Sequence, residues 1–368
     1  MKKQHLRNII LALCLLFAFG CIARYFQVKY FIQEYEPIQI TKKEITDYPD
    51  TYFIQGLTCV SYKNAYCNTA ALEMISLQHG IDKTVHYYNW LTGFTYGAGT
   101  FLPDYLARYL PYTDPEAGNK FAAPYLGLKR NYYVTNNKDL YVKALKSYLS
   151  QNYPLRVGLD AGVYRNLGGA YPHAILVVGY TDLQVYYYET GGDSDRRIPG
   201  HPGETMPWET FIASVESLDA IFVYPWTYNF TVFTKDITET DLVKVWERNA
   251  YNILGFDYTS VAAGSMAVLR LVEALDGRDL TDSDKERLKS ILEMSVYTRA
   301  DNSDFIKANF DDALLMQAAD LLQEASDTYG AITIDNNTGL IAGFKRCADI
   351  EEQVGTLMNT YCASMSNK

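Results

Sequence analysis

Cys67 has the residue type and the local setting that suit covalent chemistry. It lies in the segment VSYKNAYCNTAALEMISLQHG (60–80), where a loop precedes a predicted helix over residues 67–79 that Gly80 ends. A thiol at the start of a helix faces unpaired backbone N–H groups and the positive end of the helix dipole. Both favour the thiolate, which is the attacking form of cysteine. The position therefore predicts a cysteine nucleophile.

An imidazole and a carboxylate are predicted to meet in the segment YPHAILVVGYTDLQVYYYET (171–190). Its two apolar runs predict a β-hairpin centred near Thr181. Pairing about that centre puts His173 opposite Glu189, and directly opposed side chains have Cβ atoms about 5 Å apart. A carboxylate beside an imidazole fixes its tautomer and stabilises the imidazolium, as in nucleophile triads. Cys67, His173 and Glu189 thus form a candidate triad.

These two segments resemble the bacteriocin-processing cysteine peptidases of the double-glycine-leader type, which are papain-like enzymes. YCNTAALEMISLQHG resembles their active-site helix, and PHAILVVGY followed by VYYYET resembles their histidine strand and the strand after it. The resemblance covers roughly residues 52–225. It implies that Cys67 is the nucleophile, that His173 is the general base and acid, and that Glu189 orients His173. It requires no metal or organic cofactor.

The sequence departs from this family at three points. Asn68 replaces the glycine that usually follows the nucleophile, and Glu189 is one methylene longer than the expected aspartate. The glutamine that donates a hydrogen bond to the oxyanion usually lies shortly before the cysteine. Here Gln55, in FIQGL, is the best candidate, although its spacing from Cys67 is longer. The backbone N–H of Cys67 can provide the other oxyanion donor.

Three alternatives stay open at this point. In an exported chain, Cys67 can instead form a structural disulfide, for which Cys59 is the nearest partner. The arrangement also resembles the butirosin-biosynthesis acyltransferase group, in which the same cysteine thioester passes an acyl chain to an amine. A third interpretation is a catalytically inactive peptidase-like module that binds peptides or envelope polymers.

The first residues predict export. Lys2, Lys3 and Arg7 precede the uncharged apolar run IILALCLLFAF (9–19), as in a secretory signal peptide. The run is short for a membrane span, but an uncleaved anchor stays open as an alternative. Small residues before Cys21 also allow a bacterial lipoprotein attachment site there. We therefore expect residues 1–24 to be a signal peptide or membrane anchor, with the rest of the chain extracellular or membrane-tethered.

Charge excludes one class of partner. The 368 residues include 33 Lys and Arg against 43 Asp and Glu, a net charge of −10. Residues 1–24 hold four of the basic residues and no acidic one, so the chain without them carries −14. Nucleic-acid binding needs clustered basic residues. We therefore expect a peptide or amide substrate and no nucleic-acid partner.

Residues 50–235 are predicted to form an α+β domain, the papain-like peptidase domain of the resemblance. A helix is predicted over 139–150, and strands over 155–160, 173–180, 184–189 and 220–224. A helix followed by closely spaced strands favours an antiparallel sheet.

Residues 238–368 are predicted to be an all-α helical bundle. Helices are expected near 240–254, 259–276, 283–299, 304–328 and 345–364. Gly277 is predicted to end the second of them, and residues 281–284 to cap the third. No catalytic pattern occurs here, so this region is expected to be a scaffold or to bind a protein partner that the sequence does not identify.

Overall fold

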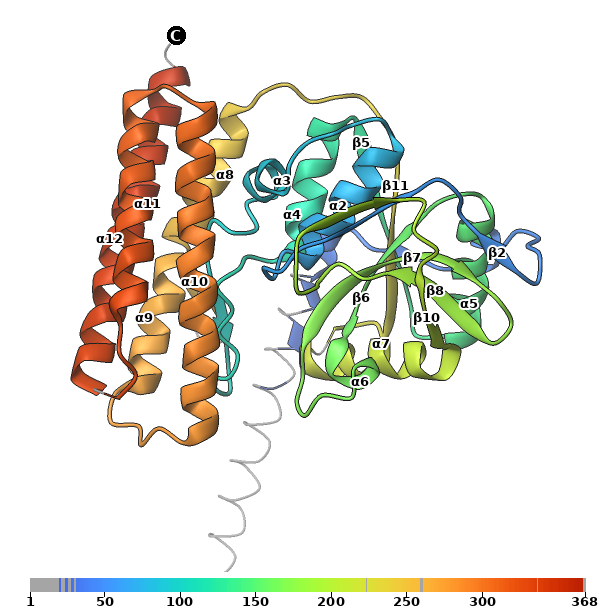
Figure 1. Ribbon diagram of the computed structural model, residues 1–368, viewed down its shortest axis with the longest axis horizontal. Coiled ribbons are helices and arrows are strands. Elements are labelled where there is room, and N and C mark those ends of the chain that lie inside the picture. The colour runs from blue at the N-terminus through green and yellow to red at the C-terminus, as the bar shows by residue number, and fades with distance from the viewer. Residues whose placement is uncertain are drawn as a thin grey trace, which may run out of the picture. The chain divides into compact units, whose positions relative to one another are not determined.

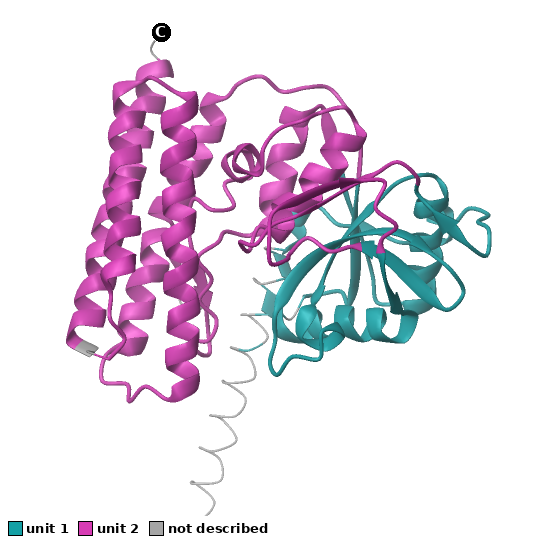
Figure 2. Ribbon diagram, viewed as in Figure 1, with its two compact units in different colours: residues 1–54, 130–187, 204–232 teal, residues 55–129, 188–203, 233–368 magenta. Residues whose placement is uncertain are grey.

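The computed structural model describes residues 20, 24–25, 28–29, 31–222, 224–258, 261–335 and 337–366. The predicted export segment, 1–24, lies almost entirely outside the described residues. Within the described residues, no helix combines the length and the apolar character that crossing a membrane requires. The chain divides into two compact units (Figure 2): unit 1 comprises residues 1–54, 130–187 and 204–232, and unit 2 comprises residues 55–129, 188–203 and 233–368.

Unit 1 is built on one sheet. Its strands follow the order β1-β5-β11-β6-β7-β8-β10, and β2 also pairs with β7 (Figure 1). Strand β6 pairs antiparallel with β7 and β11, β2 with β7, and β8 with β10, whereas β1 and β5 are parallel. The predicted antiparallel sheet is therefore confirmed. The strands are β1 (Ile38–Gln39), β2 (Tyr52–Phe53), β5 (Leu128–Thr135), β6 (Leu155–Asp160), β7 (Pro172–Tyr180), β8 (Gln184–Tyr188), β10 (Glu204–Pro207) and β11 (Tyr228–Lys235).

Helices α5 (Lys138–Ser150) and α7 (Trp208–Phe222) pack side by side on this sheet, where Tyr141 stacks on Phe211 with the ring planes 8° apart. The predicted strand over 220–224 is wrong, because α7 continues through most of it. The buried residues of α7, among them Val215 and Leu218, recur at helical spacing. Their burial stabilises the helix more than the β-branched residues of 220–224 favour a strand. Shorter helices are η1 (Lys42–Glu44) and α6 (Ala161–Tyr164).

Unit 2 combines two small sheets with helices from distant parts of the sequence. One sheet pairs β3 with β9, and the other has the order β12-β13-β4. The strands are β3 (Thr58–Ser61), β4 (Gly99–Phe101), β9 (Arg196–Pro199), β12 (Asp257–Tyr258) and β13 (Val261–Ala263). The helices are α2 (Cys67–Gln78), α3 (Val85–Thr92), α4 (Pro115–Ala122), η2 (Ala123–Leu126), α8 (Val243–Leu254), α9 (Gly264–Leu275), α10 (Asp282–Asn309), α11 (Ala313–Ala331) and α12 (Asn337–Ser366).

An aromatic core ties α3 to the C-terminal helices. The ring of Trp90 lies 5.5–5.8 Å from those of Trp246, Phe305 and Phe310, and both tryptophans are buried. Such aromatic pairs add to the free energy of burial. This packing explains why the two units do not coincide with the predicted ranges 50–235 and 238–368.

Helices α10 and α12 are longer than predicted, α8, α9 and α11 are shorter, and one predicted break is absent. The region predicted to be all-α also holds the short strands β12 and β13. Helix α10 is continuous through residues 300–303, where the sequence predicts the end of one helix and the start of another. The polar residues there are buried rather than exposed: Arg299 and Asn302 bond to Thr95, and Ser303 bonds to the Ala319 carbonyl. The predicted capping of this helix is confirmed, since Thr281 forms a capping box with Asp284.

Candidate active site around Cys67

Cys67 is the first residue of α2, as predicted. The residue before it, Tyr66, is the N-cap of the helix. Its side chain makes no hydrogen bond to the backbone N–H groups of the first turn. Among the four cysteines that the structure describes, Cys67 alone is partly exposed, because Cys59, Cys347 and Cys362 are buried. A reagent or substrate therefore meets Cys67 before it meets the other three.

The predicted alternative of a disulfide with Cys59 is wrong, because none of the four described cysteines is in a disulfide. Cys59 lies in β3 and directs its Sγ toward the Glu189 carbonyl, 4.0 Å away. Cys347 and Cys362 lie on the same helix, α12, and fifteen residues of helix separate them by about 22 Å. A disulfide needs Cα atoms within about 7 Å.

Asn68 holds the start of α2 in the interior of unit 2. Its side chain is 1% exposed and forms a reciprocal amide pair with Asn119 of α4, with N···O distances of 3.2 and 2.9 Å. The peptidases that the sequence resembles usually have glycine at this position, where no such pair can form. In this chain the residue after Cys67 is therefore fixed by its side chain rather than by a glycine turn.

A buried carboxylate that the sequence analysis missed also holds α2. Glu73 is fully buried and accepts hydrogen bonds from the Tyr62 hydroxyl (2.7 Å) and the Arg197 Nε (2.7 Å). Burial raises the pKa of Glu73, and the bonds from Tyr62 and Arg197 oppose that rise. Arg197 also binds Asp82. The signal in the sequence was a single charged residue inside the apolar run ALEMISL.

Helix α10 reaches the loop before Cys67. The Tyr297 hydroxyl accepts a hydrogen bond from the backbone N–H of Ala65 (3.0 Å), and the Tyr66 hydroxyl donates to Asp301. Burial, and next the Asp301 charge, raise the pKa of Tyr66 far above its ordinary value. His86 of α3 lies 3.9 Å from Asp301. Both residues that precede Cys67 are thus fixed by one helix of the C-terminal region.

His173 lies in β7, one residue after the strand begins, opposite Leu159 of β6. Its side chain is half-buried, and every later residue of β7 is buried. The central strands β6 and β7 therefore give the imidazole a rigid support. His173 belongs to unit 1 and Cys67 to unit 2, and their approach to each other stays a prediction.

The predicted register of the hairpin is wrong. The backbone N–H of Thr181 donates to the Gln184 carbonyl (2.9 Å), which centres the turn between Asp182 and Leu183 rather than at Thr181. Opposed residues then have numbers that sum to 365 instead of 362, so the register no longer puts His173 opposite Glu189. Asp182 and Leu183 form the turn, and the Thr181 hydroxyl fixes it by accepting hydrogen bonds from the backbone N–H groups of Leu183 and Gln184. The role of Glu189 now depends on the family resemblance alone.

Glu189 follows the last residue of β8 and is half-buried. Its Oε1 accepts hydrogen bonds from the backbone N–H groups of Thr190 (2.9 Å) and Gly191 (3.1 Å). These bonds fix the carboxylate on its own loop. A carboxylate that is held in one place is what the orienting role requires.

Gln55 lies in an exposed turn with Gly56, ahead of β3. The whole of β3 separates this turn from α2 along the chain. An oxyanion donor must be held still by its surroundings, and an exposed turn gives little support of that kind. The role of Gln55 stays a prediction.

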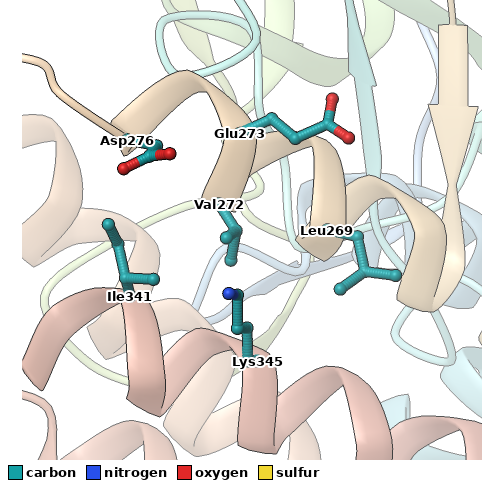
Figure 3. A pocket seen from close by; sticks show the side chains of 6 residues that line it. All are labelled: Leu269, Val272, Glu273, Asp276, Ile341 and Lys345. Atoms are coloured by element: carbon teal, nitrogen blue, oxygen red, sulfur yellow. The ribbon is translucent and has the colours of Figure 1, made fainter. Parts of the chain in front are cut away.

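A cavity of about 350 Å³ lies between α9 and α12 and holds none of the predicted site residues (Figure 3). It is lined by Leu269, Val272, Glu273, Asp276, Ile341 and Lys345.

Comparisons of the sequence with protein-family models and with curated proteins find no match.

Proposed function

We propose that this protein is a thiol-dependent hydrolase of peptide or amide bonds, with a papain-like region around Cys67 and a helical bundle at its C-terminal end. The observation that carries the proposal is the state of Cys67. It is a partly exposed thiol outside any disulfide, on the first residue of a helix, while the other described cysteines are buried. Helix position and exposure together distinguish reactive from structural cysteines.

In the proposed reaction the Cys67 sulfur attacks the carbonyl carbon of the substrate as His173 takes the thiol proton. The C–N bond then breaks, and His173 returns the proton to the leaving amine, which leaves an acyl thioester on Cys67. Water hydrolyses the thioester to release the acid and restore the thiol. Glu189 orients the imidazole, and the Cys67 backbone N–H donates to the oxyanion.

Iodoacetamide labelling of the folded, non-reduced protein tests this proposal. Mass spectrometry of each cysteine-bearing fragment should show Cys67 modified at least tenfold faster than Cys59, and His173→Ala should slow the modification of Cys67. Cys59 serves as an internal control because it is buried in the same unit. Equal labelling of both cysteines, or a Cys67 rate that His173→Ala leaves unchanged, would contradict the proposal.

Product analysis separates hydrolysis from acyl transfer. Incubation with a peptide mixture should yield free carboxylic acids in water alone, and an added primary amine should only compete with water. Products that form strictly with the amine would identify the acyltransferase instead. A labelled Cys67 with no turnover of either kind would identify the inactive binding module.

We also propose that the protein acts outside the cytoplasm, tethered or released, because residues 1–24 have the pattern of an export signal. Cell fractionation of the producing organism, with an antibody against the helical region, tests this. Recovery in the cytoplasmic fraction would contradict export. The helical region is the proposed surface for a protein partner.

A further inference from the structure

The cavity between α9 and α12 combines an aliphatic floor with charged side chains (Figure 3). Leu269, Val272 and Ile341 form the floor. Val272 belongs to the buried core of the helical region, and the other two side chains pack against that core, which holds the floor in place. The volume of about 350 Å³ lies near the lower end of the range for small-molecule sites, about 300–1,000 Å³. The cavity therefore suits a small ligand with an aliphatic side chain.

Lys345 brings a positive charge to this floor. Its side chain extends from α12 toward Val272, between Ile341 and Leu269 (Figure 3). In the described part of the chain, no carboxylate lies within ion-pair distance of its ammonium group. A cation that faces aliphatic side chains is stabilised most by an anion, because those side chains offer it no hydrogen bonds. The position therefore points to a carboxylate on the ligand.

The end of α9 brings negative charge to the same cavity. Glu273 lies in the last turn of α9, Asp276 is the C-cap, and that turn holds no basic residue. The negative end of the helix dipole adds to both carboxylates, and a cation placed there stabilises the helix end. Glu273 is already paired with Arg270 (2.6 Å), whereas Asp276 forms no ion pair with any described residue. Asp276 is therefore placed to bind an ammonium group.

We propose that this cavity binds an aliphatic α-amino acid as its zwitterion. Lys345 pairs with the carboxylate, Asp276 and the end of α9 bind the ammonium group, and the aliphatic side chain packs on the floor. Lys345 points toward Val272, which lies about 6 Å along the helix axis from Asp276. A hydrogen bond of about 3 Å at each end lets a small zwitterion span this distance. The site is separate from Cys67 and does not rest on the function proposed above.

Isothermal titration calorimetry of the full chain with leucine tests the proposal. Leucine should bind with a Kd of about 1 mM or tighter. Isocaproate has the same aliphatic group and carboxylate but no ammonium group, and isoamylamine has the ammonium group but no carboxylate. Each analogue loses one charged hydrogen bond and should bind at least about tenfold more weakly than leucine. An analogue that binds as tightly as leucine, or no leucine binding at about 10 mM, would overturn the proposal.

Two substitutions assign the two charges. Lys345→Met keeps the apolar stem of the lysine and should weaken leucine binding at least about tenfold, while isoamylamine binding stays unchanged. Asp276→Asn should weaken leucine binding in the same way and leave isocaproate binding unchanged. Both side chains are exposed, so both variants should fold, which circular dichroism checks.

Lys289→Met is the matched control. Lys289 is an exposed lysine of α10 that does not line the cavity, so its loss should leave the affinity for leucine unchanged. Equal weakening in Lys345→Met and Lys289→Met would reveal an effect of net charge alone and would overturn the proposal. A leucine affinity that neither Lys345→Met nor Asp276→Asn changes would overturn it as well. Calorimetry measures binding itself, so the outcome is the same whether or not Cys67 hydrolyses a substrate.

Discussion

Replacing Arg197 with methionine should destabilise the packing of α2, because the buried Glu73 on that helix loses the cation that pairs with it. Methionine keeps most of the apolar volume of the arginine stem. The Glu73 side chain is 0% exposed, whereas that of Arg197 is 40% exposed. Breaking a fully buried pair costs about 3–5 kcal/mol, and breaking an exposed pair costs less than about 1 kcal/mol. For this half-exposed pair we expect a loss of about 2 kcal/mol at pH 7.

Protonation of Glu73 limits the loss. At pH 7, protonating a carboxyl whose pKa has the ordinary value of 4.5 costs about 3.4 kcal/mol. The unpaired charge on Glu73 cannot destabilise the variant by more than this, because Glu73 would take up a proton instead. Burial already raises the pKa of Glu73 in the folded protein, and loss of Arg197 raises it further. The folded variant then holds a proton that the unfolded chain has released. The loss of unfolding free energy in Arg197→Met should therefore be greatest at pH values above the raised pKa of Glu73. It should shrink as the pH falls toward 4.5.

Urea denaturation followed by circular dichroism at several pH values between 4.5 and 8 measures this deficit. Asp82→Asn is the control, because Asp82 binds the same guanidinium at 2.9 Å but is 69% exposed. It should cost less than about 1 kcal/mol at any pH. An Arg197→Met deficit that matches the control, or that stays constant with pH, would refute the reasoning.

Two further substitutions test the supports of Cys67 and His173. Asn68→Ala leaves Asn119 buried without its partner and should lower the free energy of unfolding by about 1–3 kcal/mol. The double variant with Asn119→Ala should lose less than the sum of the two single variants. Strict additivity in urea denaturation would show that the pair is not coupled. Gly179→Ala puts a methyl group 2.6 Å from the Tyr52 carbonyl oxygen and should cost about 1–3 kcal/mol by displacing β2 from β7. Gly168→Ala, which meets no atom within 4 Å, should leave the melting temperature unchanged, and equal melting temperatures for the two glycine variants would contradict this account.

Regular elements with one dominant pattern were predictable from the sequence. Helix α2, helix α5 and strands β6 to β8 occur where apolar spacing and turn residues indicate them. The hairpin register was not, because it depends on which residues between Tyr180 and Gln184 the turn is centred on, and a shift of a residue or two changes which side chains oppose each other. The position of Cys67 on α2 was predictable because the helix begins after a polar loop and ends at Gly80.

The burial of charged residues could not be predicted from the sequence. Arg299 is 1% exposed and pairs with the fully buried Glu351, yet in the sequence it belongs to a run that is typical of an exposed helix end. Glu73 is a similar case. Pattern analysis assigns charged residues to the surface, and only the partner, distant in sequence, shows that the charge is buried. The partners of Arg299 and Glu73 lie 52 and 124 residues away.

The bond between Ala65 and Tyr297 spans 232 residues of sequence. A ribosome finishes α2 long before it makes α10, so a nascent chain presents Cys67 with neither Tyr297 nor Asp301 to fix the preceding loop. During synthesis the thiol is therefore exposed on an unsupported segment. The chain acquires the full surroundings of its sulfur only after about four-fifths of its length has been translated.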